Sequence, residues 1–538
     1  MTVGFQSRRL IGCALLAVLW TGYAHAAVSA GESIYRRGIL PSGAPLTAKR
    51  DSDRSISGSD AACINCHRRS GLGAVEGNIK IPPITGPYLF HRTSSGRDAF
   101  ALPPVDGMRE RDPYTDATLA RAIREGIGVD GTPLNGLMPR YALSDSDLAV
   151  LIAYLKSVTP TTSRGVTGAT VDFATIVTPD ADPVKRDAML KVLNQYFTEQ
   201  SAQALVRGPG VRPSTGPRPQ HDRRWQLRVW TLTGPSDTWG QQLVQRLARE
   251  PVFAAIAGVG GSNWEPVHRF CEDASLPCLF PNVDLPAVAE RDFYPMYISR
   301  GVLLEAGLIA SRLSDPKAAS LPRRIVQIFR AGDIGEPAAA ALRAALRGSS
   351  VQFTERRLGR SDRADAAIHG TGSGDVVVLW LRPSDIAALA SPPTPGSQVL
   401  MSGLMGGLEH APLPATWRTA TEMTYPAELP ERRRVPVDYA LGWFTLRHIP
   451  VLDERVQVDT FVTCTVLSQT LTHMGDALSR DYFVETVEAM LEHQIIDGYY
   501  PRLSLAPNER FGSKGGYWVH FAAPVGSKIL ADTDWVTP

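Results

Sequence analysis

The sequence is short of cysteine, with six in 538 residues. So few cysteines exclude a dense disulfide framework, and each one can be considered individually. An excess of charge of one sign is also lacking. The formal net charge is +2 and the arginines are scattered, which gives no reason to expect a nucleic-acid partner. Beyond the first residues, no apolar stretch is long enough for a membrane helix. With 43% hydrophobic and 20% charged residues, the chain is expected to form about two to four compact globular units.

Familiar catalytic motifs are missing as well. The chain contains no G-x-S-x-G elbow, no H-E-x-x-H motif and no Walker loop. The histidines that follow residue 200 show no metal-ligand spacing. The sequence therefore lacks the patterns of a serine hydrolase, a zinc protease or a nucleotide-hydrolysing enzyme.

A C-x-x-C-H motif is present at Cys63-Ile64-Asn65-Cys66-His67. This spacing is the attachment signature of a c-type haem, in which the two thiols add to the haem vinyl groups. His67 would then be the proximal ligand of the iron. A redox disulfide usually lies on a thioredoxin-like βαβ unit, and a zinc site needs a second Cys/His pair nearby. Neither the unit nor the pair is found here. We therefore predict one covalently attached haem c.

The N-terminus resembles an export signal. Basic residues precede an apolar run, Leu10–Trp20, which is followed by an A-x-A cleavage site at Ala24-His25-Ala26. We expect a signal peptide over residues 1–26 and a periplasmic location, the side of the membrane on which c-type haem is attached. Cys13 follows Leu10-Ile11-Gly12, but the apolar run comes after this cysteine instead of before it, so a lipoprotein is not expected.

Residues 27–158 are predicted to form one small helical domain. This rests on an amphipathic helix over 31–38, a polar insertion over 49–59 and a Pro-containing loop over 81–86. A further helix opens at 114–119, with Asp116 in its first turn, and runs to 126. The last helix is capped at 143–148 and has Leu148, Leu151, Ile152 and Leu155 on its apolar face. This segment resembles the class I cytochrome c family. The resemblance implies that the first and last helices meet, with Gly31 and Tyr35 against Tyr154 and Leu155.

The same resemblance implies a sixth iron ligand on the loop before the last helix, where this sequence has Met138. A thioether is a soft ligand, so His67/Met138 ligation would favour the reduced iron and leave no open axial position. Met108 and His91 are weaker candidates for this ligand. The family also uses a proline carbonyl to orient the proximal imidazole, and either Pro82 or Pro83 fits that role.

Residues 159–170 contain polar residues, proline and glycine without periodicity, and are predicted to be an interdomain linker. From residue 171 onward, strand and helix patterns alternate, which is typical of a parallel sheet covered on both faces. The predicted strands cover 171–177, 225–232, 252–259, 277–281, 324–329, 375–381 and 398–402, and the clearest helices cover 183–201 and 241–249.

Two consecutive α/β sets of this kind resemble the type I periplasmic binding proteins, especially the branched-chain amino-acid receptors of transporters. The predicted fold is thus an all-α cytochrome c domain followed by a two-lobed α/β domain over residues 171–538. The loops at 258–262, 281–286 and 329–335 match the family's ligand loops, at the carboxyl ends of parallel strands. They supply the candidate ligand contacts Ser262, Asn263, Asn282, Asp284 and Asp333. The family's Ser/Thr-rich run is replaced here by Asn282-Val283-Asp284, which argues against an amino-acid ligand, and a scaffold that binds nothing small is the alternative.

The remaining cysteines outside the signal segment are Cys271, Cys278 and Cys464. Cys271 and Cys278 flank a helix-to-strand turn, and in an oxidising compartment they are expected to form a disulfide. Cys464 lies in an apolar helical stretch and is expected to be inert core.

These observations predict an exported one-electron carrier, which would relay electrons from a periplasmic dehydrogenase towards the terminal-oxidase side of the respiratory chain. The binding-protein-like module would bind a small ligand or dock a redox partner. A solute receptor with an accessory haem, and a catalytic haem protein, are the alternatives.

Overall fold

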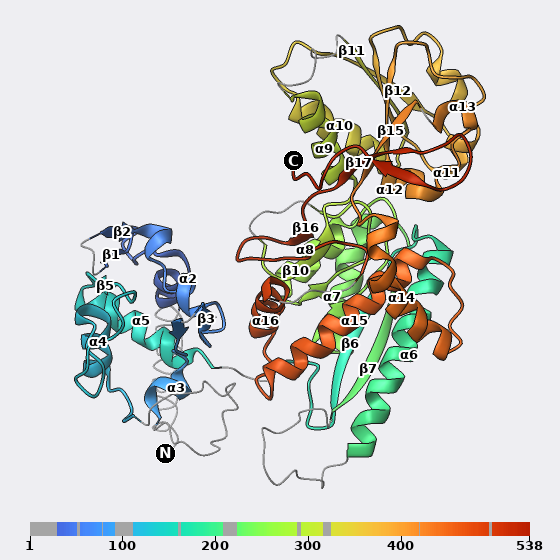
Figure 1. Cartoon of the computed structure of the whole chain (residues 1–538). Coiled ribbons are helices and arrows are strands. Elements are labelled where there is room, and N and C mark those ends of the chain that lie inside the picture. The colour runs from blue at the N-terminus through green and yellow to red at the C-terminus, as the bar shows by residue number, and fades with distance from the viewer. Residues whose placement is uncertain are drawn as a thin grey trace, which may run out of the picture. The chain divides into compact units, whose positions relative to one another are not determined.

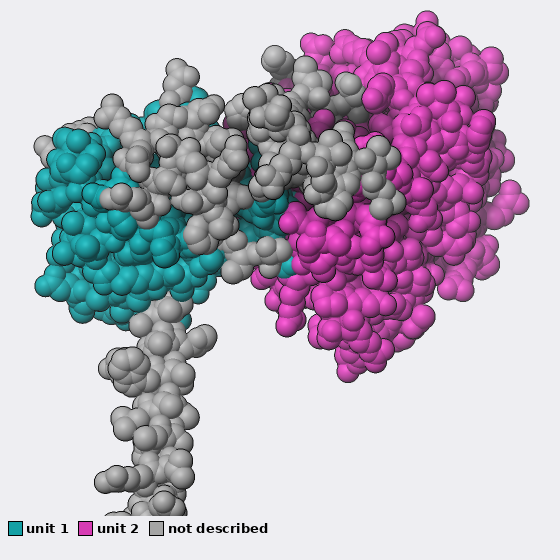
Figure 2. Space-filling view, turned by 90° about the horizontal axis from the view of Figure 1, so that it is seen from below, with its two compact units in different colours: residues 1–163, 473–485 teal, residues 164–472, 486–538 magenta. Residues whose placement is uncertain are grey.

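The structure, a computed structural model, describes residues 29–50, 54–77, 79–91, 111–159, 163–207, 223–287, 292–315, 324–418, 420–493 and 498–538 (Figure 1). The predictions for the signal peptide, Cys13 and Met108 therefore lie outside the described residues. The chain divides into two compact units, coloured separately in Figure 2. Unit 1 comprises residues 1–163 and 473–485, and unit 2 comprises residues 164–472 and 486–538.

Unit 1 is built from short elements. Residues 29–37 are helical, and the elements that follow are β1 (Thr47–Lys49), β2 (Ser55–Ser57), η1 (Gly58–Ala61), α2 (Ile64–His67), β3 (Ala74–Glu76), β4 (Ile79–Ile81), α3 (Gly86–Phe90), α4 (Asp116–Glu125), β5 (Arg140–Tyr141) and α5 (Asp145–Ser157). The Thr115 hydroxyl caps α4 by accepting the amide N–H of Thr118, and the Ser144 hydroxyl caps α5 in the same way. The helices thus begin where the capping residues predict.

The prediction of an all-α unit needs correction, because the polar insertion folds into strands. β1 pairs antiparallel with β2, and Ala48 of β1 also lies opposite Tyr141 of β5. β3 and β4 form a second antiparallel pair. This pairing supplies hydrogen-bond partners for the backbone groups of these largely exposed strands. Each strand has only two or three residues, too few for an alternating pattern to show in the sequence.

The first and last helices of unit 1 meet at a glycine. A Cβ atom on Gly31 would lie 2.2 Å from the carbonyl oxygen of Val150, so only glycine allows this approach. The ring centroids of Tyr35 and Tyr154 are 5.3 Å apart. The Tyr35 hydroxyl donates a 2.6 Å hydrogen bond to the carbonyl of Arg68. The contact predicted from Gly31 and Tyr35 is present, and it also supports the residue that follows the haem motif.

A second segment, residues 473–485, belongs to unit 1 although it lies far along the chain. It joins α15 (Glu454–Met474) to α16 (Arg480–His493). The Glu485 carboxylate accepts hydrogen bonds from the amide and the hydroxyl of Ser70, at 2.9 and 2.5 Å. Burial raises the pKa of Glu485 to about 7, against the opposing effect of the bonds from Ser70. The sequence analysis placed this segment in the second domain and did not anticipate these contacts.

The first lobe of unit 2 contains a six-stranded parallel sheet. Its strand order is β16-β10-β9-β8-β6-β7, with β6 (Thr170–Val177), β7 (Arg224–Thr231), β8 (Ala254–Ile256), β9 (Cys278–Leu279), β10 (Pro295–Ser299) and β16 (Phe511–Ser513). Phe173 packs edge-on against Phe197 of α6 (Pro183–Arg207), at 5.7 Å. Ala174 and Ile176 join the core formed with α7 (Trp239–Arg249) and α8 (Glu265–Asp273). Because both faces of β6 are covered, its sequence is a nearly continuous apolar run.

The second lobe contains a seven-stranded mixed sheet. Its order is β12-β11-β13-β14-β15-β17-β18, with β11 (Arg324–Arg330), β12 (Gln352–Leu358), β13 (Val376–Trp380), β14 (Gln398–Ser402), β15 (Thr421–Tyr425), β17 (Tyr517–Phe521) and β18 (Ile529–Ala531). The strands from β12 to β15 are parallel, and β17 and β18 add antiparallel pairs. Helices α9 (Val302–Leu313) and α10 (Gly335–Ala345) supply much of its buried core.

The chain crosses between the lobes between β10 and α9, between β15 and β16, and between β16 and β17. Further helices are η2 (Ser236–Thr238), η3 (Asp365–Ile368), α11 (Pro383–Ala387), α12 (Gly403–Gly406), η4 (Leu408–His410), α13 (Ala415–Arg418) and α14 (Pro430–Leu446). In Figure 1, α6 and α15 lie beside the sheet of the first lobe. These crossings bring the carboxyl ends of strands from both sheets to one interlobe cleft.

Candidate haem site and interlobe cleft

The histidine of the C-x-x-C-H motif is buried, with 6% of its surface exposed. Nδ1 of His67 lies 3.0 Å from the carbonyl oxygen of Pro82. Since a carbonyl can only accept, Nδ1 carries the proton and Nε2 keeps its lone pair. Burial lowers the pKa of His67 to about 4, outweighing the opposite effect of the Pro82 carbonyl. The imidazole is thus neutral and in the tautomer that binds iron through Nε2.

The two cysteines of the motif lie on one helical turn, Cys63 at its start and Cys66 within it. Cys63 is the N-cap residue of α2, and neither Cys63 nor Cys66 forms a disulfide. Burial raises the pKa of the Cys63 thiol to about 12, against a hydrogen bond with Tyr141 that lowers it. Neither cysteine is used in a disulfide, and thioether bonds to a haem require both thiols.

Met138 lies in the turn immediately before β5. Its amide donates to the carbonyl of Asn135 at 2.9 Å, and its side chain packs against the same core cluster as Cys63. Tyr141, three residues later, is hydrogen-bonded to the Cys63 thiol. The turn with Met138 and the haem motif thus share one core, and thiols, neutral imidazole and thioether form a donor set that fits a c-type haem. His91, the other candidate that the structure describes, lies exposed at the end of α3.

The cleft loops of unit 2 hold the five predicted ligand contacts, and these side chains bond to other protein groups. Asp180 accepts the amide N–H of Ser262 at 2.8 Å and its hydroxyl at 3.1 Å. The Asn263 amide group donates to the hydroxyl of Ser236 at 3.1 Å. The Asn282 amide group donates to the carbonyl of Ala257 at 3.3 Å. These side chains stabilise the loops themselves.

The two predicted acidic contacts are paired with cations. One oxygen of Asp284 lies 3.0 Å from Nζ of Lys185, and the other lies 2.8 Å from a guanidinium nitrogen of Arg455. Burial alone would raise the pKa of Asp284, but the charges of Lys185 and Arg455 outweigh it and hold this pKa well below its usual value. In the second lobe, Asp333 accepts two hydrogen bonds from Arg382, at 2.8 and 2.9 Å.

A small cavity lies beside Asp284. It is lined by Pro281, Asn282, Val283, Asp284, Ile298, Ser299, Gly301, Leu404, Pro426, Arg455, Asp459 and Tyr500. Its volume is about 20 Å³, enough for about one water molecule and too small for an amino acid. Burial raises the pKa of Asp459 to about 7, in spite of the opposing charge of Arg455. The cleft in this conformation has no space for a solute of amino-acid size at this position.

The sequence analysis missed the cations that complete this cleft. Lys185 lies in the first turn of α6, Arg455 in the first turn of α15, and Arg382 just after β13. A single basic residue on a helix is most often a solvated surface group, so nothing in the pattern marked them. Arg455 has acidic residues nearby in sequence, including Asp459 one turn later, but such spacing is common on exposed helices.

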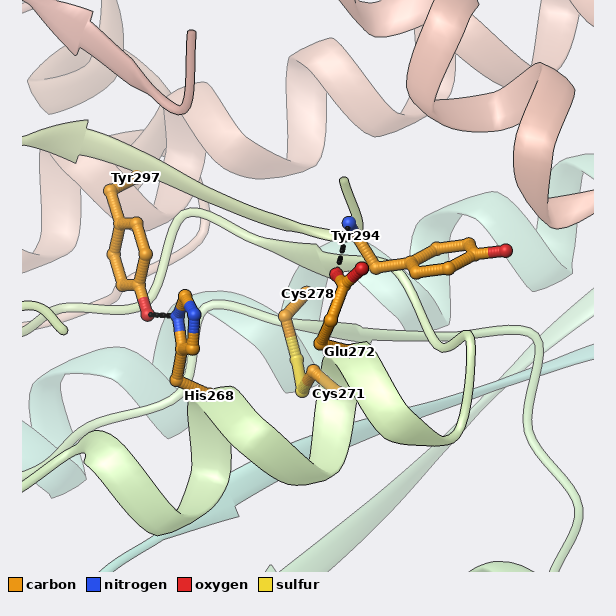
Figure 3. Close-up of a disulfide and its surroundings, with 6 residues drawn as sticks. All are labelled: His268, Cys271, Glu272, Cys278, Tyr294 and Tyr297. Atoms are coloured by element: carbon orange, nitrogen blue, oxygen red, sulfur yellow. Dashed lines mark hydrogen bonds between the residues drawn. A yellow bond between two sulfur atoms is a disulfide. The ribbon is translucent and has the colours of Figure 1, made fainter. Parts of the chain in front are cut away.

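The disulfide lies elsewhere in the first lobe. Cys271 of α8 is bonded to Cys278 of β9 (Figure 3). Beside it, the Glu272 carboxylate accepts the amide N–H groups of Phe293 and Tyr294, at 2.9 and 3.0 Å. On the same helix, Nδ1 of His268 lies 2.7 Å from the Tyr297 hydroxyl, and its Nε2 lies 2.5 Å from Asp292. These groups hold α8 against the sheet, and their contacts are structural.

Comparison with known families supports the reading of the first segment. Residues 58–159 match the family model of cytochrome c. The match includes the C-x-x-C-H motif and Met138 and covers less than half of the chain. No curated protein matches the chain.

Comparison with solved structures concerns the second unit. A substrate-binding periplasmic protein of Ralstonia solanacearum is 14% identical, with a TM-score of 0.50, over 67% of this chain and 100% of that one. A branched-chain amino acid transporter substrate-binding protein of Streptococcus pneumoniae, in complex with isoleucine, is 9% identical, with a TM-score of 0.48, over 69% and 100%. The first likeness shows the two-lobed fold and does not extend to a ligand. Among the described residues, no helix is both long and apolar enough to cross a membrane.

Proposed function

We propose that the chain is a one-electron carrier with a single haem c, attached through Cys63 and Cys66 and ligated by His67 and Met138. The observation that carries this proposal is the 3.0 Å contact between Nδ1 of His67 and the Pro82 carbonyl. It leaves an imidazole oriented for an iron ligand beside two cysteines that form no disulfide. When bound, the haem would supply a one-electron Fe(III)/Fe(II) couple.

The residues around the motif support transfer over catalysis. His67 and Met138 would fill both axial positions, so no position would be left for peroxide or another substrate. The Met138 turn is held by the pairing of Ala48 with Tyr141. The Pro82 carbonyl orients the imidazole ring, and Cys63 and Met138 both pack against the apolar core of the unit.

We further propose that residues 1–26 direct export to the periplasm, that 27–158, joined by 473–485, form the haem domain, and that 159–170 lead into the second unit. The electron donors and acceptors would be periplasmic redox proteins, a dehydrogenase on one side and a terminal-oxidase pathway on the other. The second unit has the fold of solute-binding proteins, but its cleft residues bond to one another. This favours a docking or scaffold role over a solute receptor with an accessory haem.

The test is a redox titration of the full chain after c-type maturation. The haem should titrate as one electron, remain low-spin in both states and show the weak sulfur-to-iron absorption band when oxidised. It should not bind carbon monoxide when reduced or react rapidly with peroxide. A high-spin haem that binds carbon monoxide would contradict the carrier proposal and favour the catalytic alternative.

A further inference from the structure

The strongest observation outside the haem site is the bridging position of Asp284. Its two oxygens contact two different cations, Lys185 at 3.0 Å and Arg455 at 2.8 Å. The three side chains are only 11%, 25% and 21% exposed, in the order Asp284, Lys185, Arg455. A carboxylate shared between two desolvated cations is how a protein would hold a small carboxylate ligand.

The two cations come from separate helices whose first turns are stabilised without Asp284. The amides that begin α6 are capped by Asp182, which accepts from Val184 at 2.7 Å. Those that begin α15 are capped by Asp453, which accepts from Val456 at 3.0 Å. These caps hold the backbone that carries Lys185 and Arg455, and a different carboxylate could take the same position between the two side chains.

The loop that carries Asp284 is fixed by the crossing to the second lobe. The backbone carbonyl of Asp284 accepts the amide N–H of Val302 at 2.9 Å. A Cβ on Gly301 would lie 2.0 Å from that carbonyl oxygen, so the two segments are in direct contact. Arg382 of the second lobe also lowers the pKa of Asp284 through its charge. The carboxylate thus lies where the lobes meet, at the edge of the 20 Å³ cavity.

We propose that Lys185 and Arg455 form a carboxylate-binding site that the chain occupies itself with Asp284. The unit would then keep its cleft filled without any solute, because an external carboxylate has to displace a tethered one at a far higher effective concentration. The size of the cavity restricts any replacement to a very small monocarboxylate such as formate or acetate. This inference concerns unit 2 and does not rest on the proposed electron transfer.

The test is chemical rescue of Asp284→Ala in the full haem-loaded chain. Apart from Trp20, every tryptophan lies in unit 2, so tryptophan fluorescence follows the unfolding of this unit while haem absorbance follows unit 1. Asp284→Ala should unfold several degrees below the wild type, because it leaves two half-buried cations without their shared partner. Formate should raise its unfolding temperature with saturation, at a half-maximal concentration on the order of 1 mM. Acetate should act more weakly.

The matched control is Asp284→Asn, which removes the charge but keeps the volume. It should be destabilised and should not respond to formate, because the amide fills the space that formate would enter. Formamide, the neutral analogue of formate, should not rescue either variant. Ionic strength is kept constant by exchanging chloride for formate.

The proposal is overturned if formate does not stabilise Asp284→Ala, or if it stabilises the wild type with the same saturation. The second result would mean that the two cations are open to solutes in the native protein. If Asp284→Ala does not fold, Asp284→Ser carries the same test, since its hydroxyl still bonds to one cation and leaves similar space. Saturable stabilisation of the wild type by formate would be enough to contradict the proposal.

Discussion

The haem motif of unit 1 and the cleft of unit 2 differ in how their polar side chains are used. In the haem motif, His67 uses Nδ1 for the Pro82 carbonyl, and its Nε2 would bind the iron of the proposed haem. In the cleft, the Asp284 carboxylate has a protein cation on each oxygen. Under the proposed function, the first arrangement would be completed by a haem, whereas the second is complete without an added group. A likeness of fold to solute-binding proteins therefore says less about this chain than the state of its cleft residues.

Of the changes that would test this comparison, the one that removes the haem should have the largest effect. The double variant Cys63→Ser, Cys66→Ser should carry no covalent haem, since no thiol remains for thioether bonds. Haem absorbance of the denatured, acid-extracted protein measures this. Cys464→Ser is the control and should keep its haem, because Cys464 is buried in α15. Covalent haem in the double variant would show that another cysteine carries it.

Met138→Ala should have the next largest effect. Loss of a soft thioether ligand should lower the reduction potential by on the order of 100 mV, abolish the sulfur-to-iron band and open the iron to carbon monoxide. Redox titration and absorbance spectra measure these changes. Met108→Ala should leave all three properties unchanged. If instead Met108→Ala removes the band and Met138→Ala does not, the ligand assignment is wrong.

The pKa of a buried carboxyl that is bonded to neutral groups should be raised, whereas the pKa of Asp284 is lowered by its two cations. Glu305 is fully buried and accepts hydrogen bonds from Leu404 and Thr424, at 3.0 and 2.8 Å. Burial raises its pKa to about 7, against the opposing effect of these bonds. The folded state therefore holds a proton that the unfolded state releases above its lower pKa, so stability falls as pH rises towards 7.

Glu305→Gln should weaken the pH dependence of unit 2, to which Asp459 also contributes, and make this unit more stable than the wild type at pH 8, by on the order of 2 kcal/mol. Urea unfolding followed by tryptophan fluorescence at pH 5 to 8 measures it. Ser402 also bonds to Glu305, and Ser402→Ala provides a control that loses a hydrogen bond but keeps the pH dependence. Parallel curves for wild type and Glu305→Gln would contradict the prediction.

The smallest effect is expected at the second acidic contact of the cleft. Asp333 and its partner Arg382 are 23% and 35% exposed, so water screens their pairing more than that of Asp284. Asp333→Asn should cost about 1 kcal/mol or less, against a larger loss for Asp284→Asn in the same denaturant series. Equal losses for the two variants would remove the distinction between a completed buried site and an ordinary ion pair.

Much of the fold could be predicted because the relevant signals are local. The β14 strand at Gln398–Ser402 and the start of α6 at Pro183 lie where the apolar patterns placed them. The short strands β1, β2 and β5 could not be predicted, because two or three residues carry no period. The candidate haem residues were predicted more completely than the cleft, where the loops were found but their cationic partners were not.

The haem motif could be recognised from consecutive residues, since covalent attachment needs two thiols and an imidazole on one short turn. The pairing of the other groups depends on the tertiary structure. Asp284 is 99 residues from Lys185 and 171 from Arg455, and Ser70 is 415 from Glu485. Pairs this distant form because separate elements pack together, and an ion pair or a hydrogen bond depends on distances of about 3 Å that no local pattern specifies.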